Sequence, residues 1–205
     1  MPLKHIHALT IRPARLEDCF EIARLFLMAS EGLAEYIWSR MAEPGESLIE
    51  AGARRCSGEA IACSYQNCFI AELANTTVGM LNSFPMEERD GPDDLNADPA
   101  LRPLVELRDY GSLFVSGVAV FPEHRDRGIG TRLLATTEQQ AVSYGLTRLS
   151  LICLEQNDGA MRLYSRLGFR EIDRRPLVPH PVWRSCQGDA VLLIKPADQD
   201  RRPGD

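Results

Sequence analysis

The sequence predicts an α/β fold in which helices cover both faces of one mixed β-sheet. Several short runs have the apolar content and alternation typical of strands, while other segments repeat their apolar residues at helical spacing. A hairpin signal, Ala74-Asn75-Thr76, joins two of the strand-like runs, whereas helical segments separate most of the later ones. Hairpins give antiparallel neighbours and helical crossovers give parallel ones, so we expect a mixed sheet.

The N-terminal part of the chain is predicted to start with a strand and to continue as helices. Residues 5–13 alternate well enough for a strand, and Pro13 ends it. From Leu16 to Leu27 the apolar residues recur at helical spacing, and two acidic residues lie in the first turn. Two further helical segments are expected, over residues 34–41 and 48–56.

Strands and helices alternate through the rest of the chain. Strands are expected over residues 68–73, 78–84, 112–120, 147–154, 169–175 and 190–196. Helices are expected over residues 99–108, 129–144 and 159–167, and a loop rich in Pro, Gly, Asn and Asp over residues 85–98. Gly168 closes the last helix. No linker interrupts this pattern, so we expect a single domain over residues 1–196 and a flexible polar tail over residues 197–205.

Composition indicates a globular, cytoplasmic protein. The chain has 205 residues, of which 44% are hydrophobic and 25% charged, enough for one core. No apolar run approaches membrane-spanning length, and no signal-peptide pattern opens the sequence, so no membrane partner is expected. The six cysteines contain no CxxC pair and form no ligand-spaced cluster with His, which predicts free thiols and no metal site.

The charge distribution argues against nucleic acid as a partner. The formal net charge is −6, and residues 87–109 alone hold eight acidic side chains against three arginines, a net charge of −5. Binding to nucleic acid relies on positive charge that neutralises phosphates, and the chain has no surplus of it. The acidic segment is either a solvated loop or a negatively charged lip that attracts a cationic substrate.

Residues 112–133 contain a strand, a basic glycine loop and the start of a helix. Gly128 and Gly130 allow backbone N–H groups to approach an anion, and the first turn of a helix favours negative charge. Arg125 and Arg127 add positive charge. This pattern predicts a diphosphate site for a nucleotide-type cofactor. The dinucleotide fingerprint is excluded, because Leu133 stands where its third glycine is required.

Two motifs in order resemble the GCN5-related N-acetyltransferase superfamily. They are Arg125-Asp-Arg-Gly-Ile-Gly130 and, after Asn157, the helix AMRLYSRLGF at residues 160–169. The resemblance is close over residues 112–170 and does not identify a substrate branch. It implies a central, twisted, mostly antiparallel sheet of about seven strands with helices on both faces.

The resemblance implies that acetyl-CoA is the acyl donor and binds at the glycine loop. On the family pattern, loop N–H groups hold the CoA diphosphate, and the preceding strand pairs with the pantetheine arm as though the arm were another strand. The matching residues are Val118, Ala119, Val120, Arg125, Asp126, Arg127, Gly128, Ile129, Gly130, Thr131, Asn157 and Ala160. Asn157 fits a helix cap equally well. Gly117 fits a bulge that opens the slot, or simple tight packing.

Acyl transfer to an amine requires a neutral nitrogen, a donor to the carbonyl oxygen and a proton for the leaving thiolate. On the family pattern a backbone N–H near Val120 is the donor and Tyr164 is the acid, although a Tyr at this spacing also suits core packing. The Glu that is the base of the histone-acetylating branch corresponds to Phe114, which argues against a histone substrate. The candidate bases are Glu72, Glu106, Asp109 and His180, and we select Glu72 as the catalytic residue beside Tyr164. The alternative is that no single residue acts as the base, because a water relay removes the proton or the acceptor arrives neutral.

The combined expectation is a cytoplasmic, acetyl-CoA-dependent N-acetyltransferase. It transfers the acetyl group directly, in a ternary complex, to a primary amine of a small molecule or peptide, and the family suggests a possible homodimer. Tyr36, Trp38 and Met41 are candidates for the acceptor pocket, with core burial as the alternative for Trp38. A non-catalytic acyl-CoA-binding sensor and transfer of a longer acyl group are the other two functions that fit the sequence.

Overall fold

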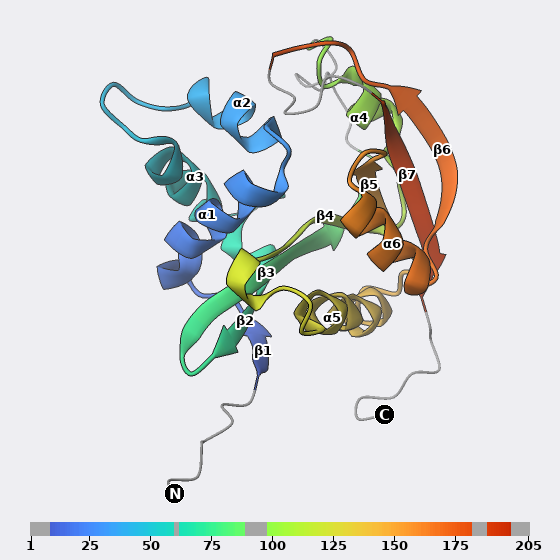
Figure 1. Ribbon diagram of the computed structural model, residues 1–205, viewed down its shortest axis with the longest axis horizontal. Coiled ribbons are helices and arrows are strands. Elements are labelled where there is room, and N and C mark those ends of the chain that lie inside the picture. Colours follow the sequence, from blue (N-terminus) through green and yellow to red (C-terminus); the bar gives the residue numbers. More distant parts are fainter. Residues whose placement is uncertain (1–8, 60–61, 89–97, 182–187, 198–205) are drawn as a thin grey trace, which may run out of the picture.

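One seven-stranded sheet, in the order β1-β2-β3-β4-β5-β7-β6, forms the centre of the protein (Figure 1). The computed structural model describes residues 9–59, 62–88, 98–181 and 188–197. The strands are β1 Thr10–Pro13, β2 Cys68–Leu73, β3 Thr76–Pro85, β4 Leu113–Val120, β5 Arg148–Leu154, β6 Arg170–Pro176 and β7 Asp189–Pro196. The α-helices are α1 Cys19–Ala29, α2 Leu33–Ser39, α3 Leu48–Cys56, α4 Arg102–Glu106, α5 Ile129–Ser143 and α6 Asp158–Arg166. The predicted α/β fold is confirmed.

The sheet is mostly antiparallel, as expected, and its one parallel junction among the described strands is between β4 and β5. The hairpin between β2 and β3 turns at Ala74 and Asn75, whose φ angles are 51° and 62°. Positive φ at both central residues is the geometry of a tight two-residue hairpin turn. The turn therefore lies where the sequence predicts it.

Helices cover both faces of this sheet. Successive residues of a strand point to opposite faces, so Ile70 and Met80 pack in one core with α1 and α3. Their neighbours Ala71 and Leu81 pack in a second core with α5. Figure 1 shows the same division, with α1, α2 and α3 together on one side of β3 and β4 and α5 on the other.

Trp38 of α2 is part of the first core. It is 4% exposed, and a Cβ atom built on Gly52 of α3 would lie 2.4 Å from the indole ring. Only glycine therefore lets α3 approach α2 this closely. The ring of Phe26 from α1 meets the same indole edge-on, with the centroids 6.5 Å apart.

Several predicted boundaries differ from the observed ones. The first strand is described only from Thr10, because residues 1–8 lie outside the described range, and α4 is shorter than the predicted residues 99–108. Leu16–Asp18 form a 3-10 turn before α1 rather than its first α-helical turn. Ala197, predicted to begin the tail, is 8% exposed and donates a hydrogen bond from its N–H to the carbonyl of Thr147, 2.9 Å away.

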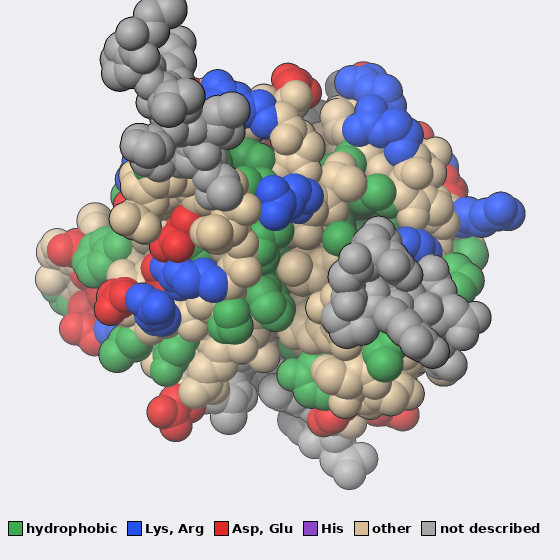
Figure 2. All heavy atoms as spheres, turned by 90° about the horizontal axis from the view of Figure 1, so that it is seen from below, with side chains coloured by type: hydrophobic (Ala, Val, Ile, Leu, Met, Phe, Trp, Pro, Cys, Tyr) green, Lys and Arg blue, Asp and Glu red, His purple; other side chains and the backbone are tan. Residues whose placement is uncertain are grey.

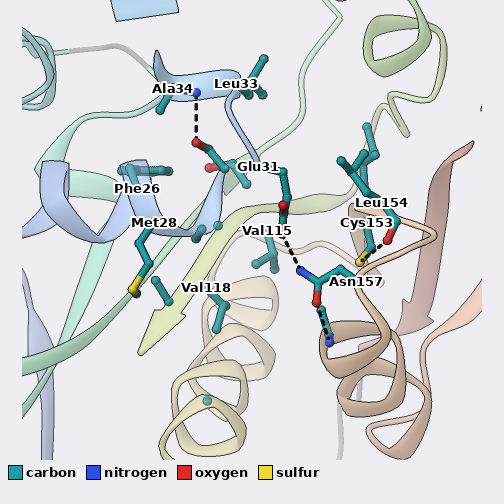
Figure 3. Close-up of a pocket in the computed structure, with 18 of the residues that line it drawn as sticks. Phe26, Met28, Glu31, Leu33, Ala34, Val115, Val118, Cys153, Leu154 and Asn157 are labelled. Atoms are coloured by element: carbon teal, nitrogen blue, oxygen red, sulfur yellow. Dashed lines mark hydrogen bonds between the residues drawn. The ribbon is translucent and has the colours of Figure 1, made fainter. Parts of the chain in front are cut away.

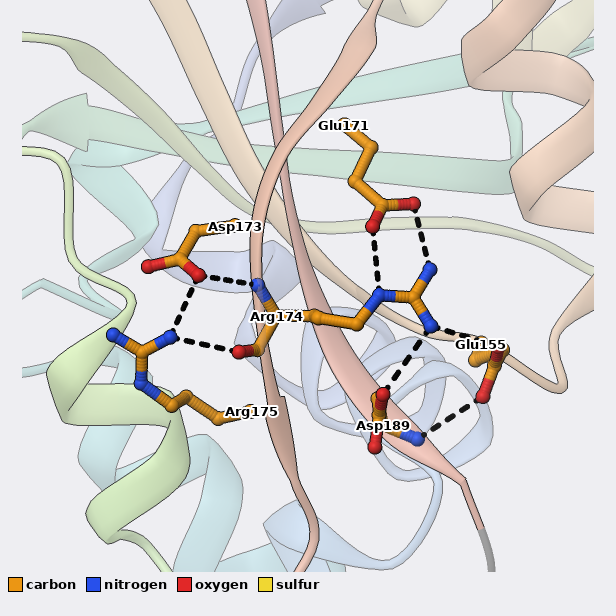
Figure 4. A network of polar contacts seen from close by, with 6 residues as sticks. All are labelled: Glu155, Glu171, Asp173, Arg174, Arg175 and Asp189. Atoms are coloured by element: carbon orange, nitrogen blue, oxygen red, sulfur yellow. Dashed lines mark hydrogen bonds and ion pairs between the residues drawn. The ribbon is translucent and has the colours of Figure 1, made fainter.

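A network of ion pairs fastens the β6 edge of the sheet to the loop after β5 (Figure 4). The Arg174 guanidinium contacts Glu171, Glu155 and Asp189 at 2.7, 3.1 and 3.2 Å. Each pair is solvent-exposed, so water and salt screen it. Together the pairs fix the position of the segment that leads from β5 into α6.

The described residues contain neither a membrane-spanning helix nor a cluster of metal ligands. No helix in these ranges combines the length and the apolar content that crossing a bilayer requires. Within the same ranges, no three His, Cys, Asp or Glu side chains come together as metal ligands.

The start of α1 is tied to the edge of the sheet by a charged cluster. Arg12 of β1 donates two hydrogen bonds to the carboxylate of Asp18, at 2.8 and 2.9 Å, and the backbone N–H of Arg15 donates a third, at 2.6 Å. Arg12 also donates to Glu72 of β2, 2.7 Å away. Burial alone would raise the pKa of Asp18, but the hydrogen bonds from Arg12 and Arg15 outweigh it and hold this pKa below its ordinary value.

We predict that Asp18→Asn lowers the free energy of unfolding at pH 7 by about 2 kcal/mol, because charge-assisted hydrogen bonds are lost. A depressed folded-state pKa means that the carboxylate stabilises the fold above the unfolded-state value of about 4. That contribution disappears as the pH falls through the folded-state pKa. Urea denaturation at pH 7 and near pH 3 should therefore show a difference that shrinks on acidification. The exposed Glu17→Gln serves as control, and a pH-independent difference for Asp18→Asn would contradict the assignment.

Candidate active site

β4 and β5 part soon after they begin, and the gap between them is the main feature of the site. They pair only at Leu113 with Leu149 and at Phe114 with Ser150. From Val115 to Val120, the edge of β4 that faces β5 has no strand partner among the described residues. Backbone N–H and C=O groups on such an edge are available to another extended chain.

A bulge in β4 marks the place where the strands separate. The register with β3 shifts so that Asn82 faces Gly117 and Ser83 faces Val115, which leaves Ser116 as the extra residue. The Ser116 hydroxyl donates a hydrogen bond to the side-chain oxygen of Asn82 and fixes the bulge. A Cβ atom on Gly117 would lie 3.0 Å from the ring of Phe26. Both interpretations of Gly117, a bulge and tight packing, therefore describe this position.

A cavity of about 900 Å³ occupies the gap. Residues of α1, α2, α3 and α4 line part of it, and residues of β4, β5, α5 and α6 line another part. Figure 3 shows Phe26 and Met28 of α1 on the left of the cavity and Cys153, Leu154 and Asn157 on the right, with Val115 and Val118 of β4 between them. Of the predicted cofactor-binding residues, all except Arg127 line this cavity.

The glycine loop leads from β4 into the N-terminus of α5. Asp126 and Gly128 both adopt left-handed conformations, with φ of 60° and 75°. Gly128 is the N-cap of α5, so no side chain caps this helix, and no acidic residue lies in its first turn. Among the described residues, no acceptor is bonded to the backbone N–H groups of residues 126–131. The positive end of α5 is therefore left for an external anion.

Local geometry at this loop fits a diphosphate. A Cβ atom on Gly128 would meet nothing within 4 Å, so the open space that a ligand requires is present. Nδ1 of His124 lines the same cavity and is buried without a hydrogen-bond partner among the described residues. A buried unpaired nitrogen is costly unless a ligand or water satisfies it. Arg125 donates from Nε to the carbonyl of Val120, 3.1 Å away, and so fixes the loop against β4.

Tyr164 lies on α6 and lines the cavity. Its ring packs edge-on against Phe169, with the centroids 5.7 Å apart, and its hydroxyl makes no hydrogen bond to any described residue. Burial, and secondarily Cys153, raises the pKa of Tyr164, so the phenol keeps its proton. Burial also raises the pKa of Cys153 to about 12, with a further contribution from Glu31, so this thiol is not a nucleophile at neutral pH.

Asn157 caps α6 and also contacts Glu31 on the other side of the cavity. Its side-chain oxygen accepts a hydrogen bond from the N–H of Ala160 at 3.1 Å, which agrees with the capping interpretation. Its Nδ2 donates to a carboxylate oxygen of Glu31 at 3.2 Å (Figure 3). The sequence interpretation did not include Glu31. The only feature of the sequence at this position is the Glu31-Gly32 pair between two predicted helices, and this pattern indicates a turn rather than a functional residue.

The predicted bases lie elsewhere. Glu72 does not line the cavity, because it sits at the β1 edge, where Arg12 holds its carboxylate. Glu106 pairs with Arg175 at 3.3 Å, and Asp109 pairs with Arg148 at 2.7 Å. His180 packs against the ring of Tyr36. None of these four side chains lines the cavity.

The predicted acceptor-pocket residues have separate environments. The hydroxyl of Tyr36 donates to Asp98 at 2.7 Å, and Met41 accepts a hydrogen bond from Arg55 at 3.2 Å. Trp38 is largely in the core, as the alternative interpretation held, although it also lines the cavity. The contact between Tyr36 and Asp98 joins α2 to the segment before α4.

Charged side chains on the surface are dispersed. On the face that Figure 2 shows, Lys and Arg side chains lie in separate groups, some of them beside acidic side chains, with apolar side chains between them. Among the described residues on this face, the Lys and Arg side chains form no continuous patch.

Comparison with known proteins places these features in a family. The model of the acetyltransferase (GNAT) family matches residues 33–169. An uncharacterised N-acetyltransferase of Methanocaldococcus jannaschii is 29% identical over 143 residues, 68% of this chain and 72% of that protein. The chloroplastic GCN5-related N-acetyltransferase 4 of Arabidopsis thaliana is 39% identical over 74 residues, 36% of this chain and 25% of that protein. Three of the curated relatives are matched over 25% to 36% of their own length.

The same fold is found among solved structures. A protein of Salmonella typhimurium, whose structure contains its cofactor acetyl-CoA, superposes with a TM-score of 0.57 at 22% identity. The superposition covers 96% of this chain and 98% of the other. The matched family region runs from α2 to Phe169 and so includes the parted strands, the glycine loop and α6. The chain belongs to the GNAT family of acetyltransferases.

Proposed function

We propose that this protein is an acetyl-CoA-dependent N-acetyltransferase that transfers the acetyl group directly to a primary amine of a small molecule or peptide. The observation that carries the proposal is the continuity of one cavity. It connects the unpaired edge of β4, the uncapped N-terminus of α5 and the hydroxyl of Tyr164. These features suit an extended thioester with a diphosphate at one end.

Each part of the cavity has a role in this proposal. The N–H groups of residues 126–131 bind the diphosphate, and backbone groups of Val118 and Val120 pair with the pantetheine arm. Acetyl-CoA supplies the activated acetyl group as a thioester. Ala160 and Asn157 border the arm from the start of α6, where the Asn157 cap fixes their position.

Tyr164 is the acid of the proposed reaction. Burial raises the pKa of Tyr164, so the phenol is protonated at neutral pH and can donate to the sulfur as negative charge develops on it. A backbone N–H near Val120 stabilises the negative charge on the carbonyl oxygen. The amine attacks the donor without a covalent enzyme intermediate, since the thiol of Cys153 stays protonated at neutral pH.

Gly128→Leu should weaken acetyl-CoA binding at least tenfold, because a side chain would fill the space through which the diphosphate approaches the loop N–H groups. Gly145→Leu is a matched control. Gly145 also has a positive φ, 68°, and a Cβ there would also meet nothing within 4 Å, but it lies after α5 and outside the cavity. Both variants should lose about 1–2 kcal/mol of stability from left-handed strain. Calorimetric affinities reduced equally in both variants, or in neither, would count against the diphosphate loop.

Tyr164→Phe should lower kcat by about 100-fold or more, because the thiolate loses its proton donor. Acetyl-CoA affinity should stay unchanged, since the ring remains packed on Phe169. CoA release measured with thiol reagent across a panel of primary amines checks this. Tyr144→Phe, at an exposed position after α5, is the control. Normal turnover in Tyr164→Phe would assign the ring to packing alone, and acetyl-CoA binding without turnover by the wild type would favour the sensor function.

A further inference from the structure

Glu31 lies in a turn for which glutamate is a poor choice. The N–H of Leu33 donates to the carbonyl of Ser30 at 2.9 Å and closes a four-residue turn between α1 and α2. Both central residues, Glu31 and Gly32, have positive φ angles, of 52° and 101°. Asn, Asp and Gly are the residues that favour this conformation. A strained non-glycine residue inside a ligand cavity is an indication of function.

The side chain of Glu31 is held from the opposite wall of the cavity. Asn157 of α6 donates to its Oε1 at 3.2 Å. The orientation of that amide is set by its other atom, because Oδ1 accepts the N–H of Ala160. Figure 3 shows the Glu31 side chain pointing from the α1–α2 turn across the gap toward Asn157, close to Cys153.

Glu31 is also an unpaired carboxylate. It makes no ion pair with any described residue, unlike Glu21, Glu46 and Glu72. Among the described residues that line the cavity, the acidic side chains are Glu31 and Asp126. Asp126 lies in the glycine loop, at the diphosphate end. Glu31 is therefore the carboxylate available at the other end.

The surroundings of Glu31 are mostly apolar. From α1, α2, α4 and β4 the cavity is lined by Phe26, Leu33, Ile37, Leu104, Val105 and Phe114. Leu33 and Leu104 belong to one apolar cluster, although they come from opposite sides of the cavity. A carboxylate among such side chains suits a ligand with a positive head and an apolar body.

We propose that Glu31 binds the ammonium group of the acceptor, a primary amine with an apolar body, and removes its proton for attack. This inference rests on the proposed function and deepens it. The ammonium gives one proton to Glu31, and the freed lone pair forms the C–N bond with the thioester carbonyl carbon. The C–S bond breaks and its electron pair stays on sulfur, which takes the proton of Tyr164. The second proton on nitrogen returns to Tyr164, and Glu31 releases its proton to solvent.

Binding of 2-phenylethylamine to the CoA-loaded protein, measured by calorimetry, is the first test. Glu31→Gln keeps an oxygen that can accept from Asn157 but removes the charge, so affinity for the amine should fall at least tenfold. CoA affinity should not change. Glu21→Gln is the control for charge, because Glu21 of α1 pairs with Arg24 and lies outside the cavity. Equal amine affinity in Glu31→Gln and the wild type would overturn the proposal, as would a CoA-loaded wild type that does not bind the amine.

A second variant separates function from folding. Glu31→Gly suits the left-handed backbone, so its melting temperature should equal or exceed that of the wild type while amine affinity falls as in Glu31→Gln. A lower melting temperature with unchanged amine affinity would show that Glu31 only supports the turn. Acetyl-CoA binding by the wild type is measured separately. If the wild type does not bind acetyl-CoA, the proposed function is refuted. The measurements of amine affinity decide the role of Glu31.

Turnover against pH gives the third readout. A free primary amine loses its own proton near pH 10, so the rate deficit of Glu31→Gln, about 100-fold at pH 7, should narrow as the pH approaches that value. The pKa values of Cys153, about 12, and of Tyr164, raised by burial, keep both groups protonated over this range. Arg55 of α3 and Arg108, which follows α4, line the same cavity. A deficit that is constant with pH would argue against proton removal by Glu31.

Discussion

The separation of β4 from β5 is the constraint on which the rest of the structure depends. Buried backbone N–H and C=O groups must find partners, and in a sheet the neighbouring strand supplies them. Beyond Phe114 that neighbour is missing, yet Val115 and Ala119 are 3% and 5% exposed. The bulge at Ser116, fixed by Asn82, and the ring of Phe26 against Gly117 hold β4 in this position. The sheet is thus built around an edge that an extended ligand can complete.

Two helices start at this cavity, and they differ in whether the chain supplies acceptors and negative charge for the free N–H groups of their first turns. α6 begins at Asn157, whose side chain accepts from the N–H of Ala160, and Asp158 adds negative charge. α5 begins at Gly128, with no capping side chain and no acidic residue in its first turn. Because the partial positive charge of a helix N-terminus attracts anions unless the chain neutralises it, the cavity is electrostatically asymmetric. The diphosphate of the proposed donor fits the α5 end, and the thioester then lies toward Tyr164 and Glu31.

The sequence predicted the fold because the patterns behind it are local. Ile70 and Ala71, or Met80 and Leu81, divide between two cores as strand alternation requires, and the loop residues with Asn157 and Tyr164 lie in two short motifs. The proposed base, Glu31, could not be found in this way. Glu72 lies on a strand, as a catalytic Glu would, but only the sheet order shows that it belongs to the far edge, beside Arg12. Glu31 meets Asn157 across 126 positions of sequence, a distance over which no spacing rule applies.

Phe114 on β4 and Glu31 in the α1–α2 turn are compatible, because an apolar strand side leaves the turn as the place for a carboxylate. Phe114 packs edge-on against Phe84 from β3, with ring centroids 5.7 Å apart, so the strand side of the acceptor end is apolar. A carboxylate there would lose hydration without gaining a charged partner. A carboxylate in the α1–α2 turn avoids this cost, because Glu31 stays partly exposed and accepts a hydrogen bond from Asn157. The turn thus brings a charge to an otherwise apolar end, which is the arrangement that an amine with an apolar body requires.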